Sequence, residues 1–416
     1  MENMGVMADG GVCRSCGGTD LCEVLSLGDT PLANALLTES QLTAPEPCYP
    51  LDLVFCRLCS LVQITETVPP ADLFGEYLYF SSVSDTMVIH ASRLVQRVIR
   101  ERRLNGNSLA AEIASNDGYL LQAYKQAQIP IVGIEPATNI AAVARERDIP
   151  TVCEFFSFQL VDKLIDEYGR ADVVHANNVL AHVPDLNGVV QGFRRFVKDS
   201  GVIIVEVPYV RDMVDGTEFD TVYHEHLCYF SVTALTRLFD RHGLVIHDVE
   251  RLGIHGGSLR IFSGISDYAA KPSRNVQRLL DQEAQDNIDR SDFFLTFAER
   301  VETLKTELLN LLSELRDAGK TVAAYGASAK GSTLLNYFGI DATVIKFVVD
   351  RSSVKQGRYT PGTHIPIRDP EALLKERPDY VLLLTWNFEE EVLRQQDVYR
   401  QGGGKFIIPI PKLRVV

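Results

Sequence analysis

The sequence predicts an α/β protein in which a small cysteine-rich N-terminal domain precedes two separate doubly wound α/β units. Three observations lead to this prediction: two C-x-x-C pairs before residue 60, a strand–helix alternation after residue 87, and a second alternation after residue 319. Strands that alternate with helices form parallel sheets covered on both faces. A chain of 416 residues is too long for one hydrophobic core, so several domains are expected.

Composition limits the class of protein. The chain is 46% hydrophobic and 23% charged, as is usual for a soluble globular protein. Its net charge of −14 argues against nucleic-acid binding, which needs clustered Lys and Arg, but not against a nucleotide ligand. No apolar run approaches roughly 18 residues and no signal pattern opens the sequence. We therefore expect a cytoplasmic protein without membrane contact.

The N-terminal segment contains a metal-binding pattern. Cys13 and Cys16 form one C-x-x-C pair, and Cys56 and Cys59 form another after a long loop. Each pair places two thiolates on one tight turn, and the two pairs together supply the tetrahedral Cys₄ shell of a structural zinc site. Zinc is favoured because disulfides are rare in the cytosol. The alternative is two unrelated redox or buried pairs.

Strand and helix positions follow from hydrophobic periodicity. The central unit opens with an amphipathic helix near Met87. Its buried strands are expected at residues 108–113, 130–135, 171–176 and 201–207. Long helical periodicity over residues 273–318 predicts a helical connector. The second unit is expected to have strands at residues 321–325, 344–349, 380–384 and 405–408.

The first strand–helix loop of the central unit, residues 112–118, predicts a nucleoside site. Glu135 ends the next strand, where a carboxylate can bind ribose hydroxyls. Only Gly118 of a G-x-G-x-x-G pattern is present, and Ala114 and Ser115 crowd the place where two phosphates would lie. A nucleoside without phosphates, such as S-adenosylmethionine, fits this loop better than a dinucleotide.

The second α/β unit has a comparable loop at residues 326–332, and Asp350 closes its next strand. The loop lacks the lysine position of a P-loop, but it could hold a phosphate at a helix N-terminus with Lys330 adding charge. A tight turn with a solvated lysine is the alternative. Arg358 is a further cation in a turn-rich loop.

Four consecutive residues combine proton-transfer groups: Tyr223, His224, Glu225 and His226. A neutral imidazole beside a carboxylate can take a proton, and a phenol can donate to a developing oxyanion. These groups together could form an enolate. The alternative is a helix end or turn whose polar side chains face solvent or cap one another.

Taken together, these segments resemble one family, the zinc-containing, S-adenosylmethionine-dependent sugar C-methyltransferases that build branched deoxysugars on nucleotide diphosphates. The resemblance runs from Cys13 to the C-terminus. Besides the motifs above, it rests on residues 77–82, 133–136, 176–184, 254–258 and 360–366.

The resemblance implies a domain plan and a reaction. It implies a zinc-binding domain at residues 1–75 and a class I methyltransferase Rossmann-like domain at residues 76–265. A helical connector would follow at residues 266–318. A second Rossmann-like α/β domain at residues 319–416 would help to bind the nucleotide sugar. The methyl acceptor would be a dTDP-4-keto-deoxysugar, methylated at C3 next to the ketone, with C5 or another acceptor left open. A monomer is expected because three domains can bury their own faces.

The resemblance also implies catalytic roles. His226 would be the base that removes the proton next to the ketone, and Glu225 would orient its ring or move protons. Tyr223 and Tyr79 would lie close to the sugar. His182 would hydrogen-bond the ketone or a sugar hydroxyl.

Further contacts are implied for the cofactor and the substrate. The cofactor contacts are Glu112, Ala114, Asn116, Gly118, Glu135, Pro136, Asn177 and Asn178. The substrate contacts are Tyr79, Ser81, Ser82, His255, Ser328, Lys330 and Arg358. Two positions depart from the family pattern: Ala114 stands where glycine is usual, and His224 stands where an acidic residue is expected.

Two functions of other classes compete with this one. An NAD(P)-dependent oxidoreductase would use residues 326–331 and Asp350, although that loop lacks G-x-G-x-x-G spacing. A non-catalytic zinc scaffold that binds a nucleotide sugar or a partner protein would need neither a methyl donor nor the side chains at residues 223–226.

Overall fold

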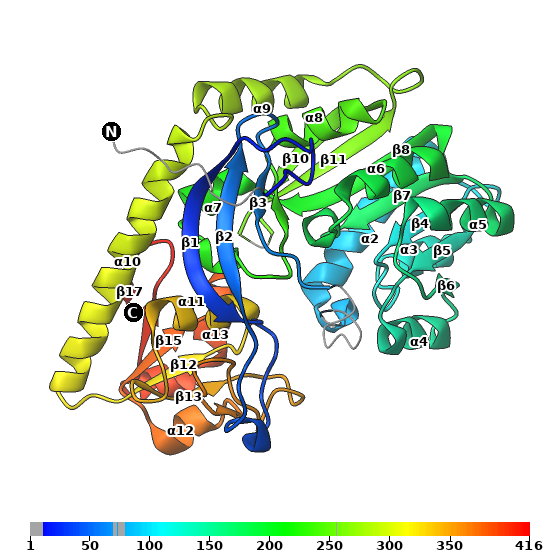
Figure 1. The fold of residues 1–416 in the computed structure, drawn as a ribbon. Coiled ribbons are helices and arrows are strands. Elements are labelled where there is room, and N and C mark those ends of the chain that lie inside the picture. The colour runs from blue at the N-terminus through cyan, green and yellow to red at the C-terminus, as the bar shows by residue number, and fades with distance from the viewer. Residues whose placement is uncertain (1–10, 70–72, 74–79, 255) are drawn as a thin grey trace.

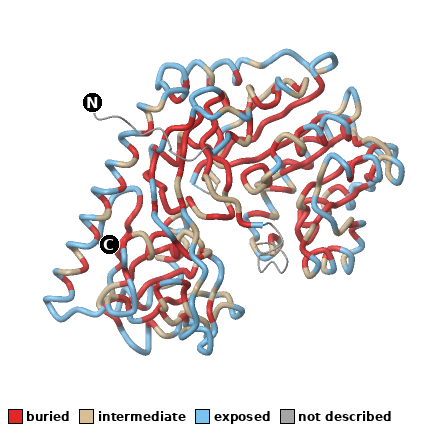
Figure 2. Tube along the Cα trace, in the orientation of Figure 1, coloured by how far each residue is buried: buried red, intermediate tan, exposed pale blue. Residues whose placement is uncertain are grey.

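The computed structural model describes residues 11–69, 73, 80–254 and 256–416, and these form three β-sheets with helices around them (Figure 1). Buried residues follow the strands and the helix faces that cover them (Figure 2). The predicted α/β class is confirmed. Among the described residues, no helix combines the length and the apolar character needed to cross a bilayer.

The N-terminal sheet has the order β1-β2-β3-β9 and is antiparallel throughout. Its first three strands are β1 (Leu21–Pro31), β2 (Cys48–Cys56) and β3 (Val62–Ile64). The fourth strand, β9 (Cys228–Tyr229), comes from the central part of the chain and places Tyr229 opposite Val62. The sheet is thus completed by residues that directly follow the cluster at residues 223–226.

The central sheet has seven strands in the order β10-β11-β8-β7-β4-β5-β6. The strands are β4 (Ala110–Ile113), β5 (Ile131–Ile134), β6 (Thr151–Val152), β7 (Ala171–Asn177), β8 (Val197–Pro208), β10 (Leu244–Leu252) and β11 (Ser258–Ile265). β11 is antiparallel to both neighbours, and the other strands run parallel. The strand order reverses at β4, and ligands of such sheets bind at the carboxyl ends of the strands near this switch point.

Three central strands were not predicted. β6 is too short to give a periodic signal, and β10 and β11 contain charged side chains within their runs. One of these, Arg260 on β11, is buried against Glu206 of β8 at 2.6 Å, and Glu206 also lies 3.0 Å from His90. Pairing of this kind makes a buried charge tolerable, but it leaves no trace in local periodicity.

Helices cover the central sheet and then lead to the C-terminal unit. The covering helices are α2 (Asp85–Arg102), α3 (Leu121–Gln126), α4 (Thr138–Glu146), α5 (Phe158–Tyr168), α6 (Leu186–Phe196), α7 (Val210–Asp215) and α8 (Val232–Arg241). The predicted connector consists of two helices, α9 (Arg274–Gln285) and α10 (Asp292–Asp317). The long α10 runs beside the β1–β2 hairpin toward the C-terminal sheet (Figure 1).

The C-terminal sheet has the order β14-β13-β12-β15-β16-β17, and only β17 is antiparallel to its neighbour. The strands are β12 (Val322–Tyr325), β13 (Ile345–Val349), β14 (Ile367–Arg368), β15 (Tyr380–Leu383), β16 (Lys405–Ile408) and β17 (Arg414–Val415). Its helices are α11 (Ala329–Phe338), α12 (Ala372–Glu376), α13 (Glu389–Gln395) and α14 (Asp397–Gln401). As in the central sheet, the order reverses at the first strand, β12.

The β1–β2 hairpin reaches the C-terminal unit. Leu37 and Tyr359 exchange two backbone hydrogen bonds of 3.0 and 2.9 Å. Glu46 accepts from the backbone N–H of Gly362 at 2.9 Å and lies 2.5 Å from His364. The N-terminal domain therefore contacts both α/β units.

A buried carboxylate holds α9 against the start of α8. Glu283 is 1% exposed and accepts hydrogen bonds from the Tyr209 hydroxyl, the backbone N–H groups of Val232 and Thr233, and the Thr233 hydroxyl. These distances lie between 2.6 and 2.8 Å. Two of the donors are first-turn N–H groups of α8, which have no partner within the helix.

Replacing Glu283 with Ala is expected to lower the free energy of unfolding by at least about 3 kcal/mol, because several buried donors lose their acceptor. Urea unfolding followed by circular dichroism measures this loss. Glu307→Ala on the exposed face of α10 is the control and should change stability little. Equal stability of the two variants would contradict the anchoring role of Glu283.

Candidate active site and metal centre

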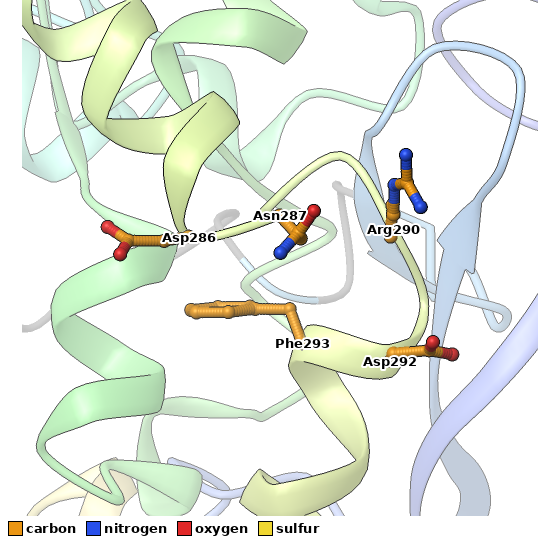
Figure 3. Close-up of a pocket in the computed structure, with 5 residues that line it drawn as sticks. All are labelled: Asp286, Asn287, Arg290, Asp292 and Phe293. Carbon is orange, nitrogen blue, oxygen red and sulfur yellow. The ribbon is translucent and has the colours of Figure 1, made fainter.

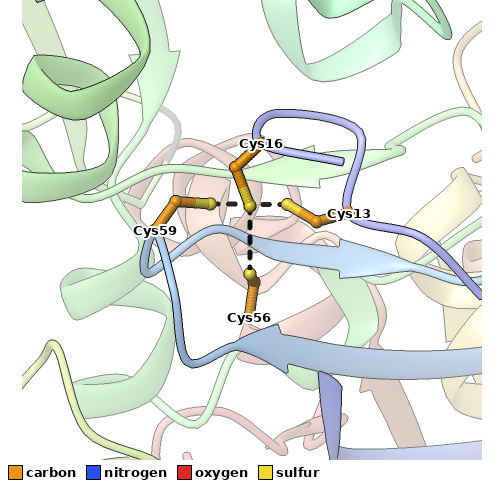
Figure 4. Close-up of side chains that lie close together, drawn as sticks. All are labelled: Cys13, Cys16, Cys56 and Cys59. Carbon is orange, nitrogen blue, oxygen red and sulfur yellow. Dashed lines mark hydrogen bonds between the residues drawn. The ribbon is translucent and has the colours of Figure 1, made fainter. Parts of the chain in front are cut away.

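Four cysteine side chains meet at one end of the N-terminal sheet (Figure 4). The Sγ atoms of Cys13 and Cys59 lie 3.4 Å apart, and those of Cys16 and Cys56 lie 3.6 Å apart. All four sulfur atoms lie within 4.8 Å of one another. A tetrahedral ZnS₄ centre with Zn–S bonds of about 2.3 Å needs S–S separations of about 3.8 Å. The donor set and its spacing therefore fit a structural zinc ion.

The two C-x-x-C turns have the same backbone construction. The residue after the second cysteine of the first turn, Gly17, has φ 72° and donates to the carbonyl of Cys13 at 2.8 Å. In the second turn Ser60 has φ 64° and donates to the carbonyl of Cys56 at 2.8 Å. This left-handed residue closes each turn so that both thiols of a pair point the same way.

Side chains of the central domain bind the cysteine turns from outside. Asn187 donates to the carbonyls of Arg14 and Ser15 at 2.8 and 3.1 Å. Arg241 donates to the carbonyl of Ser15 at 2.9 Å, and Arg237 donates to the Ser60 hydroxyl at 2.6 Å. The metal centre is therefore packed against α6 and α8.

The predicted cofactor residues gather at the carboxyl edge of the central sheet. Ala114 and Asn116, in the loop after β4, both have φ 49°, and Gly118 has φ 78°. Glu135 at the end of β5 accepts from the backbone N–H groups of Asn116 and Ala137, both at 2.9 Å. Glu135 thus fixes the backbone of the loop after β4. Burial raises the pKa of Glu135, and these two backbone hydrogen bonds oppose the rise.

The remaining predicted cofactor residues border the same edge. Pro136 follows Glu135 directly, and Asn177 ends β7. Asn178 has φ 57°, and its N–H donates to the carbonyl of Glu206 at 2.8 Å. Glu112 is 1% exposed, and burial raises its pKa well above the usual range, with the charges of Glu135, Asp117 and Glu206 adding to the effect.

Several buried polar atoms at this edge lack protein partners. Within the described part of the chain, Glu112 Oε2, Ser115 Oγ, Asp117 Oδ1 and Asn177 Oδ1 make no hydrogen bond. Buried polar atoms are normally satisfied, so such a group of them indicates a ligand or ordered water. The acceptor-rich set fits the amines and hydroxyls of a nucleoside with an amino-acid side chain.

Two predicted substrate residues contact the loop at residues 112–118. The backbone N–H of Ser81, in η2 (Ser81–Val83), donates to Asn116 Oδ1 at 2.8 Å. The hydroxyl of Ser82 donates to Asp117, which also forms a 3.0 Å ion pair with Arg147. The segment before α2 is thereby fastened over the loop.

The predicted proton-transfer residues lie together beside β7. The ring Nδ1 of His226 lies 2.9 Å from the carbonyl oxygen of Thr221, and its Nε2 lies 2.8 Å from the Tyr223 hydroxyl. A carbonyl only accepts, so Nδ1 carries the proton of the neutral ring, and Nε2 accepts from Tyr223. The His182 ring, in η3 (Leu180–His182), lies edge-on to His226 with centroids 4.8 Å apart.

His182 is fixed by the same segment. Its Nδ1 lies 2.7 Å from the backbone carbonyl of Glu225, so Nδ1 carries the proton and Nε2 has the lone pair. Burial lowers the pKa of His182 to about 4, against the opposing effect of this hydrogen bond. The ring is therefore neutral at neutral pH.

The other two residues of the cluster contact the N-terminal domain. The carboxylate of Glu225 is 6% exposed and accepts from Asn34 Nδ2 at 2.7 Å. His224 is 2% exposed, and its Nε2 lies 3.3 and 3.2 Å from the carbonyls of Tyr49 and Pro50 on β2. The departure at position 224 therefore fastens the β1–β2 hairpin.

The loop of the C-terminal unit is largely bonded within itself. The Ser328 hydroxyl caps α11 by accepting from the N–H of Gly331 at 3.1 Å. The N–H of Ala327 donates to the carboxylate of Asp350 at 2.9 Å. Lys330, predicted as a solvated or phosphate-binding residue, has its ammonium buried 4.5 Å from the Trp386 ring centroid and without a hydrogen-bond partner among the described residues.

Two buried acids face Lys330 from the central domain. Glu218 and Asp220, at η4 (Phe219–Thr221), are 7% and 0% exposed. Burial raises the pKa of Glu218 to about 8 and that of Asp220 to about 6, while the charge of Lys330 opposes both rises. Asp220 also accepts from Trp386 Nε1 at 2.8 Å. This group of charges joins the central and C-terminal units.

Three predicted residues remain. Arg358 is half-buried in the loop before β14, and no hydrogen bond or ion pair of its guanidinium occurs within the described ranges. Tyr79 and His255 lie outside the described residues. A pocket of about 280 Å³ between α9 and α10 contains none of the predicted residues (Figure 3). It is lined by Asp286, Asn287, Arg290, Asp292 and Phe293.

Four side chains and one backbone carbonyl contact the residues of the 223–226 cluster or of the Lys330 group, although no local sequence motif indicated them. They are Asn34, Glu218, Asp220, Trp386 and the carbonyl of Thr221. Asn34 acts across 191 residues and Trp386 across 166 residues. Thr221 was within reach of sequence reasoning, since it lies two residues before Tyr223, the first residue of the Tyr-His-Glu-His run.

Cys59→Ser is expected to remove bound zinc and lower the melting temperature, because a structural zinc site contributes directly to folding. Zinc per chain is measured by elemental analysis of the purified protein. Cys48→Ser is the matched control, since Cys48 is an exposed cysteine outside the Cys₄ group. Full zinc content in Cys59→Ser would contradict the assignment.

Glu218→Gln is expected to make the protein more stable than the wild type at pH 8.5, by on the order of a few kcal/mol. Burial raises the pKa of Glu218 to about 8 in the folded protein. The contribution of protonated Glu218 to stability is therefore fully present below the pKa that Glu218 has in the unfolded chain, and it is lost as pH rises through 8. Chemical unfolding at pH 5, 7 and 8.5 measures the difference, which should shrink toward pH 5. A pH-independent difference would show that Glu218 does not titrate in this range.

Family models match three consecutive parts of the chain. Residues 13–74 match the description "Putative zinc binding domain", residues 90–249 match "Methyltransferase domain", and residues 253–411 match "C-methyltransferase C-terminal domain". The first range contains the four cysteines, and the second contains the carboxyl edge of the central sheet and the His226 cluster.

Several known proteins are similar to this chain. The C-methyltransferase NovU of Streptomyces niveus is 36% identical over 406 residues, which is 97% of this chain and 96% of the relative. The solved structure of a magnesium protoporphyrin IX methyltransferase from Synechocystis with bound S-adenosylmethionine has 14% identity and TM-score 0.32 over 46% of this chain and 87% of that one. An S-adenosylmethionine-dependent methyltransferase from Clostridium acetobutylicum has 10% identity and TM-score 0.34 over 42% of this chain and 90% of that one. TM-scores this low support no conclusion by themselves.

The end-to-end identity to NovU, the zinc-binding and methyltransferase family matches, the Cys₄ centre and the nucleoside-type edge all agree. The chain therefore belongs to the zinc-binding, S-adenosylmethionine-dependent C-methyltransferase family.

Proposed function

We propose that this C-methyltransferase acts on a dTDP-4-keto-deoxysugar and methylates C3, the carbon next to the ketone, with His226 as the base. The observation that carries the proposal is the placement of His226, whose Nδ1 is fixed on the Thr221 carbonyl while its lone pair at Nε2 faces Tyr223. A carbon acid needs such a base, whereas a more acidic oxygen acceptor would depend on it less.

The base is held in the form that the reaction requires. Because Nδ1 keeps its proton, Nε2 of His226 is the atom that would take the C3 proton. The Thr221 carbonyl then stabilises the imidazolium by accepting from Nδ1. The Tyr223 hydroxyl, which donates to Nε2 in this structure, would turn to the ketone oxygen and donate to the developing enolate.

His182 suits a different contact. Since its Nδ1 proton is held by the Glu225 carbonyl, its Nε2 can accept but not donate. An acceptor pairs with a sugar hydroxyl rather than with a ketone. We therefore assign His182 to a hydroxyl of the sugar, and Tyr79 to the sugar as the sequence resemblance implies.

The cofactor would lie at the carboxyl edge of the central sheet. There Glu135 would bind the ribose hydroxyls, and the unpartnered atoms of Glu112, Ser115, Asp117 and Asn177 would receive its remaining donors. When bound, S-adenosylmethionine supplies a methyl group on a sulfonium that a carbon nucleophile can accept. Because η3 follows β7 directly, this edge lies next to the His226 cluster.

The nucleotide diphosphate would contact the C-terminal unit. The Lys330 ammonium has no protein acceptor in the described structure, and the guanidinium of Arg358 makes no ion pair there. With a pKa of about 8, Glu218 is mostly protonated at neutral pH and would repel a diphosphate little. The side chain of Ser328 caps the N-terminus of α11, and through this turn Ser328 would contribute to binding the diphosphate.

The direct test is NMR of the protein with a dTDP-4-keto-6-deoxysugar in D₂O. Deuterium should replace the C3 proton without cofactor, and a carbon-bound methyl should appear at C3 once S-adenosylmethionine is added. Exchange and methylation at C5 would show that the methyl group is transferred to C5 and not to C3. If several 4-keto sugars undergo neither exchange nor methylation, the proposed acceptor is refuted.

His226→Ala is expected to reduce both exchange and methylation by at least about 100-fold, the usual contribution of a positioned general base. Its affinity for S-adenosylmethionine, measured by calorimetry, should stay close to that of the wild type. His247→Ala is the control, because this histidine lies on β10 away from the cluster. Wild-type exchange by His226→Ala would assign the base to another residue.

A further inference from the structure

The N-terminal domain contributes a side chain to the proton-transfer cluster. Asn34 follows β1 and donates from Nδ2 to Oε1 of Glu225 at 2.7 Å, across 191 residues of sequence. This is the hydrogen bond that the Glu225 side chain makes within the described part of the protein. Asn34 belongs to neither the metal centre nor the cofactor edge.

Glu225 depends strongly on that bond. The carboxylate is 6% exposed and forms no ion pair with any described Lys or Arg. Burial raises its pKa, and the hydrogen bond from Asn34 lowers it. The titratable groups around it are His182 on η3 and its chain neighbours Tyr223, His224 and His226. Asn34 is therefore the partner that favours the ionised carboxylate.

Glu225 is also bound to both histidines of the cluster through its backbone. Its carbonyl accepts from Nδ1 of His182 at 2.7 Å, and the next residue is His226. The N–H of Leu227 then donates to the carbonyl of Ala181 at 2.6 Å. A displacement of Glu225 would consequently shift the His182 and His226 rings relative to each other.

We propose that Asn34 is a positioning residue, through which the zinc-binding domain holds the carboxylate of Glu225, the residue that precedes the base His226 in the chain. The inference rests on the proposed function insofar as His226 is the base. It assigns to the N-terminal domain a part in catalysis besides carrying zinc. Without the amide donor, Glu225 would be held only by its backbone and would keep its proton to higher pH.

The test uses full-length protein with Asn34→Ala and the isosteric Asn34→Asp, which lacks the amide donor. Methyl transfer is measured from pH 5.5 to 9. The acidic limb of the kcat profile should move upward by about one to two pH units in Asn34→Ala, and at least as far in Asn34→Asp. The KM for S-adenosylmethionine should change less than twofold.

The matched control is Asn187→Ala. Asn187 also joins the central domain to the N-terminal domain, but it donates to the carbonyls of Arg14 and Ser15. If a weaker contact between the two domains were enough to shift the pH profile, Asn187→Ala would shift it as Asn34→Ala does. That result would overturn the positioning role of Asn34. An unshifted profile in Asn187→Ala, together with a shifted one in Asn34→Ala, supports it.

A second readout needs no substrate. Protein labelled with ¹³C at the glutamate carboxyl carbon, with Glu225→Gln to assign the signal, reports the titration of Glu225 by NMR. An equal midpoint in the wild type and in both Asn34 variants would overturn the inference. If the wild type fails to exchange or methylate 4-keto sugars, the proposed acceptor is wrong, while a moved Glu225 midpoint still establishes the Asn34 contact.

Discussion

Two residues of the central chain, Cys228 and Tyr229, leave their own domain and pair with β3 as the last strand of the N-terminal sheet. This pairing fixes where the preceding residues lie. The N–H of Ile64 on β3 donates to the carbonyl of Leu227 at 3.1 Å, so the chain that carries His226 is fastened to the zinc-binding domain one residue later. Gln63 on the same strand bonds the backbone of Val12 and Arg14 beside the metal centre. The zinc site thus stabilises a sheet that also holds the proton-transfer cluster.

The carboxyl edge of the central sheet shows a different constraint. Glu112, Asp117 and Glu135 are all buried there, and Glu112 Oε2 and Asp117 Oδ1 have no hydrogen-bond partner within the described residues. Burying acceptors without partners is unfavourable, and native proteins tolerate it where a ligand completes the set. The same reasoning applies to the Lys330 ammonium at the C-terminal unit. Unsatisfied polar atoms therefore mark both ends of the space in which cofactor and nucleotide are proposed to lie.

Polar contacts join the three parts of the chain. Glu225 bonds Asn34, His224 bonds β2, and Asp220 bonds Trp386, and each of these pairs joins two different sheets or their helices. Glu225 and His224 bond the N-terminal part, and Asp220, three residues before Tyr223, bonds the C-terminal part. The position of residues 220–226 therefore depends on how all three parts assemble. A substitution in one part is expected to alter chemistry carried by another.

Hydrophobic periodicity and motif spacing by themselves determined the α/β class, the helical connector, the Cys₄ group and the presence of a Tyr-His-Glu-His cluster. β16 was predicted at its observed residues because a short apolar strand between turns has a clear local signal. Tertiary structure alone decided that β9 completes the N-terminal sheet, that Asn34 reaches Glu225, and that Lys330 is buried against Trp386 and two acids. The physical reason is separation along the chain. A hydrogen bond across 191 residues imposes no pattern on the residues near either partner, whereas a strand or a C-x-x-C turn is specified by its immediate neighbours.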